Sequence, residues 1–224
     1  MKSVLITGGT VRLGKAIAAR LRAEGWRVIT SSHRPDAGAD IVADLAEPMG
    51  AAKLYAATLQ MLGGNPPDAL VNNAALFTGN EEAIAAINLE APKKLTVMMA
   101  GRETGVGAVV NVLDAAASDS RSSSDSSNSR TASQAGRGYL ESKRELRAFT
   151  LSSAATFAAT LRVNGVAPGP VMAPTDVHEK AGEMLLDRRP TADDVTAAVS
   201  YLLGAEAVTG TVIPVDSGQH LLEA

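Results

Sequence analysis

The alternation of short apolar runs with Ala- and Leu-rich stretches is the feature that most constrains the fold of this 224-residue chain. Runs rich in Val, Ile and Leu predict strands that are buried on both faces. The stretches between them predict helices, because apolar residues recur there at three- to four-residue spacing, as Leu13, Ile17 and Leu21 do. We expect strands over Ser3–Thr7, Arg27–Ser31, Asp40–Ala43, Ala69–Val71, Gly107–Leu113, Arg162–Val166 and Thr211–Val215, and helices over Leu13–Glu24, Ala51–Leu62, Ala83–Ala100, Tyr139–Thr160 and Asp193–Leu203.

Strands that alternate with helices predict an α/β fold with a doubly wound parallel sheet, a Rossmann-type arrangement of three layers, α/β/α. One segment, Ser118–Ser133, interrupts the pattern. It is dominated by Ser and lacks apolar periodicity, which predicts a flexible surface loop. Because the sheet pattern resumes after this loop, we expect a single domain over residues 1–224. Ligands of such sheets bind beyond the carboxyl ends of the strands.

Composition narrows the class of partner. The chain has no Cys, and its three His residues (His33, His178 and His220) are scattered, so we expect no metal site. A net charge of −3 gives no general attraction to nucleic acid or to an anionic membrane. No apolar run reaches the ~18–20 residues of a membrane helix, and the N-terminus lacks a signal-peptide pattern. These features predict a cytoplasmic protein with a small-molecule substrate.

A glycine-rich turn, Thr7–Gly14, follows the first predicted strand. Glycine lets a backbone approach a pyrophosphate closely, and the following helix N-terminus offers N–H groups to it. The strict GxGxxG pattern is not matched, because Arg12 stands in the place of its middle glycine. A guanidinium at this place can pair with a 2′-phosphate of a dinucleotide. An ordinary tight turn is the alternative.

The end of the second strand favours the same ligand. Folds that prefer NAD carry an acidic residue there, which would repel a phosphate. Here the residues are Ser31, Ser32, His33 and Arg34, whose hydroxyls and cations suit a phosphate. The pattern predicts NADPH over NADH, with a solvated basic turn as the alternative.

Tyr139 and Lys143 are four residues apart, so their phenol and ammonium share one helix face. An ammonium beside a phenol lowers the phenol pKa, and such a tyrosine can deliver a proton. An unremarkable surface pair is the alternative. Asp114 ends the fifth strand, where a carboxylate suits N–H groups and a hydroxyl would suit a ketone oxygen. Its alternative is a turn residue at a strand end.

Several motifs in chain order resemble the short-chain dehydrogenase/reductase family. They are TGxxxRxG at Thr7, Asn72-Asn73-Ala74-Ala75, YxxxK at Tyr139, the Arg162-Val163-Asn164 strand with its Pro168-Gly169 turn, and the closing VTG and VDSG segments. Arg12, Asp114 and the GxHL ending resemble its pteridine reductase and dihydromonapterin reductase members. The resemblance implies a Rossmann fold, an NADP/NADPH cofactor and a homo-oligomer, dimer or tetramer. Small residues of the helix after Tyr139 would permit close packing; they are Ala154, Ala155, Ala158 and Ala159.

The resemblance also implies roles for individual residues. Asn88 would hold a water in a proton relay, unless it is a helix-interior Asn. Asp44 would bind the adenine edge, unless it caps a helix, and Asn73 would be partly structural. The implied catalytic residues are Asp114, Tyr139, Lys143 and Asn88. The implied cofactor-binding residues are Gly8, Thr10, Arg12, Leu13, Gly14, His33, Arg34, Asp44, Leu45, Asn73, Ala74, Tyr139, Lys143, Pro168, Gly169 and Val171.

The expected function is hydride transfer from NADPH to a small C=N or C=O substrate, with a pterin or dihydrofolate-like compound favoured. Phe77 is the one well-placed aromatic residue for stacking such a ring. An aldehyde or ketone reductase is the first alternative, and a non-catalytic NADPH-binding regulator is the second. Residues 170–191 predict a lid or a small packed helix, with an apolar face from Met172, Val177, Met184, Leu185 and Leu186.

Overall fold

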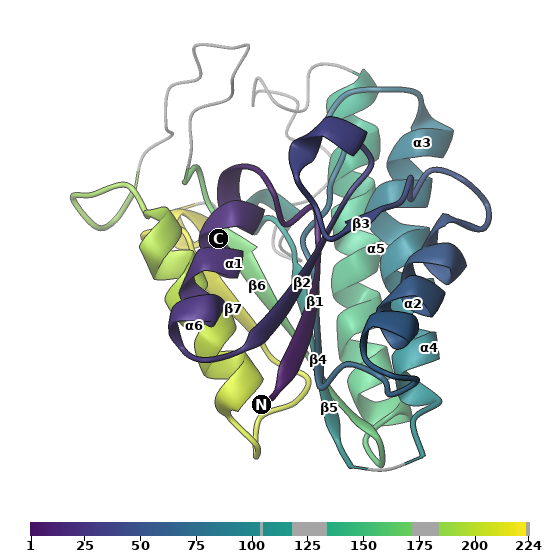
Figure 1. Cartoon of the computed structure of the whole chain (residues 1–224). Coiled ribbons are helices and arrows are strands. Elements are labelled where there is room, and N and C mark those ends of the chain that lie inside the picture. The colour runs from purple at the N-terminus through teal and green to yellow at the C-terminus, as the bar shows by residue number, and fades with distance from the viewer. Residues whose placement is uncertain (104, 118–133, 172–183, 223–224) are drawn as a thin grey trace.

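A computed structural model of the chain describes residues 1–103, 105–117, 134–171 and 184–222. Within these residues, seven strands form one parallel sheet in the order β3-β2-β1-β4-β5-β6-β7 (Figure 1). The sequence order reverses between β1 and β4, which is where ligands bind in sheets of this kind. The strands are β1 (Ser3–Thr7), β2 (Arg27–Ser32), β3 (Ile41–Val42), β4 (Ala69–Asn72), β5 (Gly107–Val112), β6 (Leu161–Pro168) and β7 (Val212–Val215).

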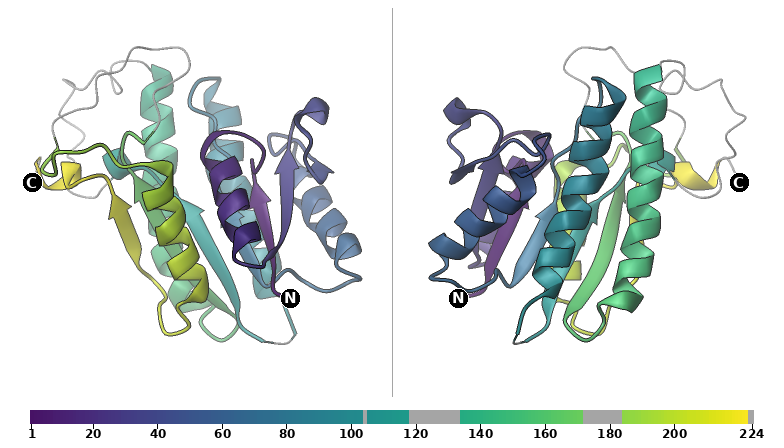
Figure 2. Two further views of the ribbon diagram at one scale, coloured as in Figure 1. Left: turned by 60° about the vertical axis from the view of Figure 1, so that its left-hand side comes forward. Right: turned by 90° about the vertical axis from the view of Figure 1, so that its right-hand side faces the viewer.

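Helices cover both faces of the sheet, which confirms the predicted three-layer α/β arrangement. Figure 2 shows α1 and α6 on one face and α2, α4 and α5 on the other. The helices are α1 (Arg12–Ala23), α2 (Gly50–Met61), α3 (Glu81–Ala85), α4 (Ala91–Ala100), α5 (Gln134–Thr156) and α6 (Ala192–Gly204). Four short helical turns are also present in the described residues: η1 (Pro35–Ala37), η2 (Ala86–Glu90), η3 (Ala115–Ala117) and, after β7, η4 (Gln219–Leu221).

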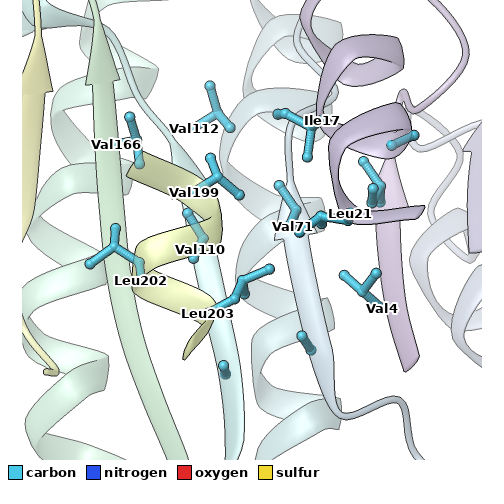
Figure 3. Packing of buried hydrophobic residues seen from close by; sticks show 14 of the residues in the cluster. Val4, Ile17, Leu21, Val71, Val110, Val112, Val166, Val199, Leu202 and Leu203 are labelled. Atoms are coloured by element: carbon cyan, nitrogen blue, oxygen red, sulfur yellow. The ribbon is translucent and has the colours of Figure 1, made fainter. Parts of the chain in front are cut away.

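The core is divided by the sheet into two layers. Alternate residues of β1 enter different layers: Val4 and Ile6 lie in one, and Leu5 lies in the other. The first layer packs Ile17 and Leu21 of α1, together with apolar side chains of α6, against the strands (Figure 3). Burial on both faces explains why these strands are continuous apolar runs.

Two predicted helices differ from the structure by more than one residue at an end or in their internal geometry, and the others differ by one residue at each end. The predicted helix Ala83–Ala100 consists of α3, a π-helical turn η2 and α4. The predicted helix Tyr139–Thr160 begins earlier, at Gln134, and ends at Thr156. Residues 134–138 show no apolar periodicity, so the sequence pattern does not predict the first turn of α5.

Some expectations fall outside the described residues. The predicted Ser-rich loop, 118–133, lies outside them, as do residues 172–183 of the predicted lid. In the part of the chain that is described, no helix has the length and apolar character needed to cross a bilayer. No group of three or more His, Asp or Glu side chains among the described residues could hold a metal ion.

Candidate active site

The glycine-rich turn joins β1 to α1 at the carboxyl edge of the sheet. Gly8 has φ 63°, and a Cβ there would lie 3.1 Å from the Cα of Ala74. A Cβ on Gly14 would collide with the carbonyl oxygen of Gly8. The N–H of Gly9 donates to the carbonyl of Ser31 at 3.2 Å. The turn is therefore held closely against the ends of β2 and β4, and glycine is required where it touches them.

Thr7 and Asn73 tie this turn to the segment after β4. The hydroxyl of Thr7 accepts the backbone N–H groups of Asn73 and Ala74, both at 3.0 Å. The Asn73 side-chain amide donates to the carbonyls of Thr7, at 3.0 Å, and Gly8, at 3.1 Å. These bonds confirm the structural role expected for Asn73. Thr7 was not among the predicted site residues, although a hydroxyl at the end of an apolar strand is a signal that could have identified it.

The N-terminus of α1 carries no side-chain cap from the described residues, and its first turn holds no acidic residue. By contrast, Asn80 caps α3, and Thr191 caps α6 in a capping box with Asp194. An uncapped helix N-terminus at a glycine turn is a ready anion site. Arg12 has φ 47°, a left-handed conformation that costs a non-glycine residue about 1 kcal/mol. This conformation explains why glycine usually occupies the corresponding place in the fingerprint.

His33 and Arg34 follow β2 and are exposed, whereas Ser31 and Ser32 are buried. The backbone N–H of Arg34 donates to the Ser32 hydroxyl at 3.1 Å. Thr7 at the end of β1 pairs with Ser31 of β2. His33 and Arg34, which follow β2, therefore lie beside the glycine turn. The structure therefore brings the predicted phosphate-binding residues to one edge.

Asp44 follows β3 at the same edge. Its carboxylate accepts the N–H of Ala46 at 2.9 Å in a local turn. Since α2 begins at Gly50 with Met49 as its N-cap, the helix-cap alternative for Asp44 is wrong. The neighbouring Leu45 is buried in the core, so only its backbone is placed to meet a ligand. Leu13 likewise packs against the core, and Thr10 lies in the glycine turn.

The predicted catalytic residues lie together at the end of β5. The phenol of Tyr139 donates to Oδ2 of Asp114 at 3.0 Å. The other carboxylate oxygen of Asp114 accepts the N–H of Ala116 at 2.8 Å. Nζ of Lys143 lies 5.8 Å from the centroid of the Tyr139 ring and donates to the carbonyl of Val112 at 2.7 Å. The surface-pair alternative is therefore wrong, because Lys143 is only 2% exposed.

Burial governs the charge of Lys143. Desolvation lowers its pKa from the ordinary 10.5 to about 8, and the negative charge of Asp114 acts in the opposite direction. An ammonium with a pKa near neutrality, one helical turn from a phenol, can respond to charge that develops there. This electrostatic arrangement is typical of a group of residues that handles protons.

A separate buried polar network joins the neighbouring strands β4 and β5 to α5. The side-chain amide of Asn72 donates to Oδ1 of Asn111 at 2.8 Å, and that of Asn111 donates to the Thr150 hydroxyl at 2.9 Å. Thr150 donates in turn to the carbonyl of Leu146 at 2.7 Å. Oδ1 of Asn72 has no hydrogen-bond partner among the described residues. The network links β4, β5 and α5 and was not predicted. Asn at the ends of two apolar strands is the signal for it.

Asn88 is buried in the π-helical turn, and each of its polar atoms has a protein partner. Oδ1 accepts the N–H of Leu76 at 2.7 Å, and Nδ2 donates to the carbonyl of Leu76 at 2.9 Å and to the Ser142 hydroxyl at 3.1 Å. The Ser142 hydroxyl donates to the carbonyl of Tyr139 at 2.6 Å. The side chain of Asn88 therefore braces the backbone of the tyrosine. Its predicted role in holding a relay water stays a prediction.

The turn after β6 completes the edge. The N–H of Gly169 donates to the carbonyl of Val215 at 3.0 Å, and the N–H of Val171 donates to the carbonyl of Gly169 at 2.8 Å. Pro168, Gly169 and Val171 thus lie at the same edge as the other predicted cofactor residues. Phe77 lies edge-on to Tyr139 with ring centroids 4.9 Å apart, and it is 45% exposed. Phe77 therefore lies beside the predicted catalytic pair, and its role in stacking a substrate ring stays a prediction.

Comparisons with known proteins agree with this geometry. A family model described as enoyl-(acyl carrier protein) reductase matches residues 11–220. The levodione reductase of Leifsonia aquatica is 30% identical, over 96% of this chain and 93% of that protein. The pteridine reductase 1 of Leishmania tarentolae is 27% identical, over 98% of this chain and 96% of that protein.

A solved structure of similar fold is the FolM alternative dihydrofolate reductase 1 of Brucella canis, complexed with NADP. It superimposes with a TM-score of 0.80 at 28% identity, and the match covers 98% of this chain and 94% of that one. The pteridine reductase match and the structural match each cover 98% of this chain, and the family model spans the Tyr139–Lys143 pair. The chain therefore belongs to the short-chain dehydrogenase/reductase family of NAD(P)-dependent oxidoreductases.

Proposed function

We propose that this protein is an NADPH-dependent reductase that transfers hydride to a small substrate with a C=N bond, of the pterin or dihydrofolate class. The observation that carries the proposal is the 3.0 Å hydrogen bond between the Tyr139 phenol and the Asp114 carboxylate. A carboxylate presents acceptors to the substrate and so favours ring N–H groups. A serine in this place would donate to a ketone oxygen instead.

The residues of the glycine turn fit NADPH. The uncapped N-terminus of α1 suits the pyrophosphate, and the glycines leave no Cβ between the turn and that ligand. Arg12, His33 and Arg34 supply cations for the 2′-phosphate, and the sequence from Ser31 to Pro35 contains no acid to repel it. The NADP complex of the similar Brucella canis reductase supports this assignment.

When bound, NADPH supplies the hydride. The proton shared by Tyr139 and Asp114 passes to the substrate nitrogen as hydride reaches the adjacent carbon, so that C=N becomes CH–NH. The cation of Lys143 stabilises the negative charge that this transfer leaves on the pair. Asn88, acting through Ser142, holds the backbone of Tyr139 in place during the transfer.

The test measures NADPH oxidation with a panel of dihydropterins and a panel of ketones. For the wild type we expect turnover of the dihydropterins. Asp114→Ser should lower kcat/KM for dihydropterins about 100-fold, because one catalytic proton-transfer group is removed. Asp193→Ser, in the exposed first turn of α6, is the matched control. An unchanged dihydropterin rate in Asp114→Ser would refute the proposed role.

A carbonyl reductase is the second candidate, because one relative of similar coverage is a levodione reductase. Turnover of ketones without turnover of dihydropterins would favour it. Tight NADPH binding with no turnover of either panel would instead favour a non-catalytic binding protein.

We further propose that the chain acts in the cytoplasm as a homo-oligomer. Ala155 is exposed on α5 and is available for close packing between subunits. Ala154 is buried within its own subunit, and Ala158 and Ala159 lie beyond the end of α5. Sedimentation measurements of the purified protein test this assembly.

A further inference from the structure

A second buried carboxylate lies at the carboxyl edge of the sheet, one residue after β7. Asp216 is 2% exposed and accepts the backbone N–H groups of Gly218 at 3.1 Å and His220 at 2.8 Å. Nδ1 of the His220 ring lies 2.8 Å from Oδ2 and 3.0 Å from Oδ1 of the same carboxylate. The carboxylate therefore fixes both the backbone turn and the orientation of the imidazole.

The fold places this Asp–His pair close to the proposed catalytic residues. The turn η4, which contains His220, contacts η3, and η3 begins directly after Asp114. On another side, η3 packs against Leu140 and Tyr139. A Cβ on Gly169 would lie 2.8 Å from the Cβ of Asp216, so Asp216 also touches the turn after β6. His220 thus belongs to the same edge as the Tyr139–Asp114 bond, with η3 between them.

The backbone around the Asp216–His220 pair is also held by Leu185 and Leu186. Ser217 has φ 57°, and its carbonyl accepts the N–H groups of Leu185 at 3.1 Å and Leu186 at 3.0 Å. A Cβ on Gly218 would lie 3.0 Å from the Cβ of Leu185. These contacts determine where the His220 backbone lies. Its side chain nevertheless retains 28% exposure, so the ring is not enclosed by protein.

The chemistry of the ring follows from its partner. A carboxylate at Nδ1 stabilises the tautomer with the proton on Nδ1, which leaves the Nε2 lone pair of the neutral ring as an acceptor. The carboxylate of Asp114 is an acceptor as well. A substrate that carries N–H donors can bond to acceptors of this kind, whereas a simple ketone has none to offer.

We propose that His220, oriented by Asp216, binds the substrate through Nε2 by accepting a hydrogen bond from a substrate N–H. This inference rests on the proposed function and adds a specificity-determining residue to it. The hydrogen bond forms equally in the ground state and the transition state, so its loss raises KM and leaves kcat nearly unchanged. Binding of NADPH, which does not involve Nε2 of His220, stays the same.

The experiment compares His220→Leu and His220→Gln with Leu221→Ala, a matched control in the same turn that alters an exposed side chain. Steady-state kinetics are measured with NADPH and 7,8-dihydrobiopterin, and NADPH affinity is measured by fluorescence. We expect His220→Leu to raise KM for dihydrobiopterin about tenfold, the effect of one hydrogen bond. Glutamine offers an amide oxygen as acceptor, so His220→Gln should recover most of this loss.

The possible outcomes distinguish a failure of the His220 inference from a failure of the proposed function. If the wild type reduces dihydrobiopterin and both His220 variants keep its KM, His220 has no role in binding and the proposed function stands. A fall in kcat with unchanged KM would likewise overturn the binding role. If the wild type binds NADPH but reduces no dihydropterin, the proposed function fails and the inference fails with it.

Discussion

The two halves of the sheet edge are built in different ways. Around β1, β2 and β3, the predicted cofactor residues offer backbone N–H groups, an uncapped helix N-terminus and exposed basic side chains. Around β4, β5 and α5, buried side chains of Asn72, Asn111 and Thr150 bond to one another, and Tyr139 bonds to Asp114. The first half presents charge to solvent, and in the second half buried side chains bond to one another.

The contrast reflects what each half has to do. A phosphate is recognised by cations that remain solvated until the ligand arrives, because burying an unpaired cation is costly. Proton transfer requires groups fixed within a few tenths of an ångström, because misplacement lowers the rate. Substitutions in the second half should therefore cost catalysis or stability, and those in the first half should change cofactor preference.

The largest expected effect is that of Tyr139→Phe. Removing the phenol deletes the proposed proton donor and its bond to Asp114 while leaving the ring against Phe77. We expect kcat for dihydropterin reduction to fall about 10²- to 10⁴-fold. Tyr201→Phe on α6, where the ring is exposed, is the control and should keep wild-type turnover. A variant at Tyr139 that retains more than a tenth of the activity would place the proton donor elsewhere.

Asn88→Ala tests how much the buried hydrogen bonds of Asn88 stabilise the second half. The substitution removes three side-chain hydrogen bonds and leaves the N–H and carbonyl of Leu76 without those partners. We expect the free energy of unfolding, measured in urea, to fall by about 3–4 kcal/mol. Asn80→Ala removes the exposed cap of α3 and should cost only about 1 kcal/mol. Equal losses would show that burial of Asn88 contributes nothing.

The buried ammonium gives the second half a pH dependence. Since the folded pKa of Lys143 is about 8 and its ordinary value is 10.5, the unfolded chain binds more protons between these values. The stability of the wild type relative to Lys143→Met should therefore rise by about 2–3 kcal/mol as pH increases from about 8 to 10.5. Below pH 8 the difference should be constant. A difference that stays level across the whole range would contradict the lowered pKa.

Arg34→Ala is expected to have the smallest effect and acts on the first half. Loss of one exposed cation should raise the apparent KM for NADPH about five- to tenfold, with little change for NADH. Lys53→Ala, an exposed cation on α2, is the control. If NADPH and NADH respond alike, Arg34 does not contact the 2′-phosphate.

Within the second half, some features could be predicted from the sequence and others could not. The strands followed from apolar runs, and Tyr139, Lys143 and Asp114 followed from local spacing and strand ends, because each signal lies within a few residues. The Asn72–Asn111–Thr150 network and the bonds of Asn88 to Leu76 and Ser142 join positions far apart in the sequence. The order of residue types along the chain does not indicate which distant side chains will form hydrogen bonds.

The π-helical turn and the pairing of Asp216 with His220 could not be predicted from the sequence either. Residues Ala86–Glu90 have ordinary helix-forming composition, and nothing in their order distinguishes a π turn from an α turn. His220 was recognised only as a scattered histidine and as part of the GxHL ending. Its pairing with Asp216 depends on a turn at Ser217 with positive φ, which the apolar pattern does not encode.

The four bonds that Thr7 and Asn73 make between the turns after β1 and β4 have a consequence for ligand length. They hold the glycine turn that is proposed to bind the phosphates against the segment after β4, so the distance between these two segments is set by the protein itself. A binding site of fixed length favours a dinucleotide, whose two halves can occupy both of its ends. A mononucleotide bound at the phosphate end would not be positioned at the other end.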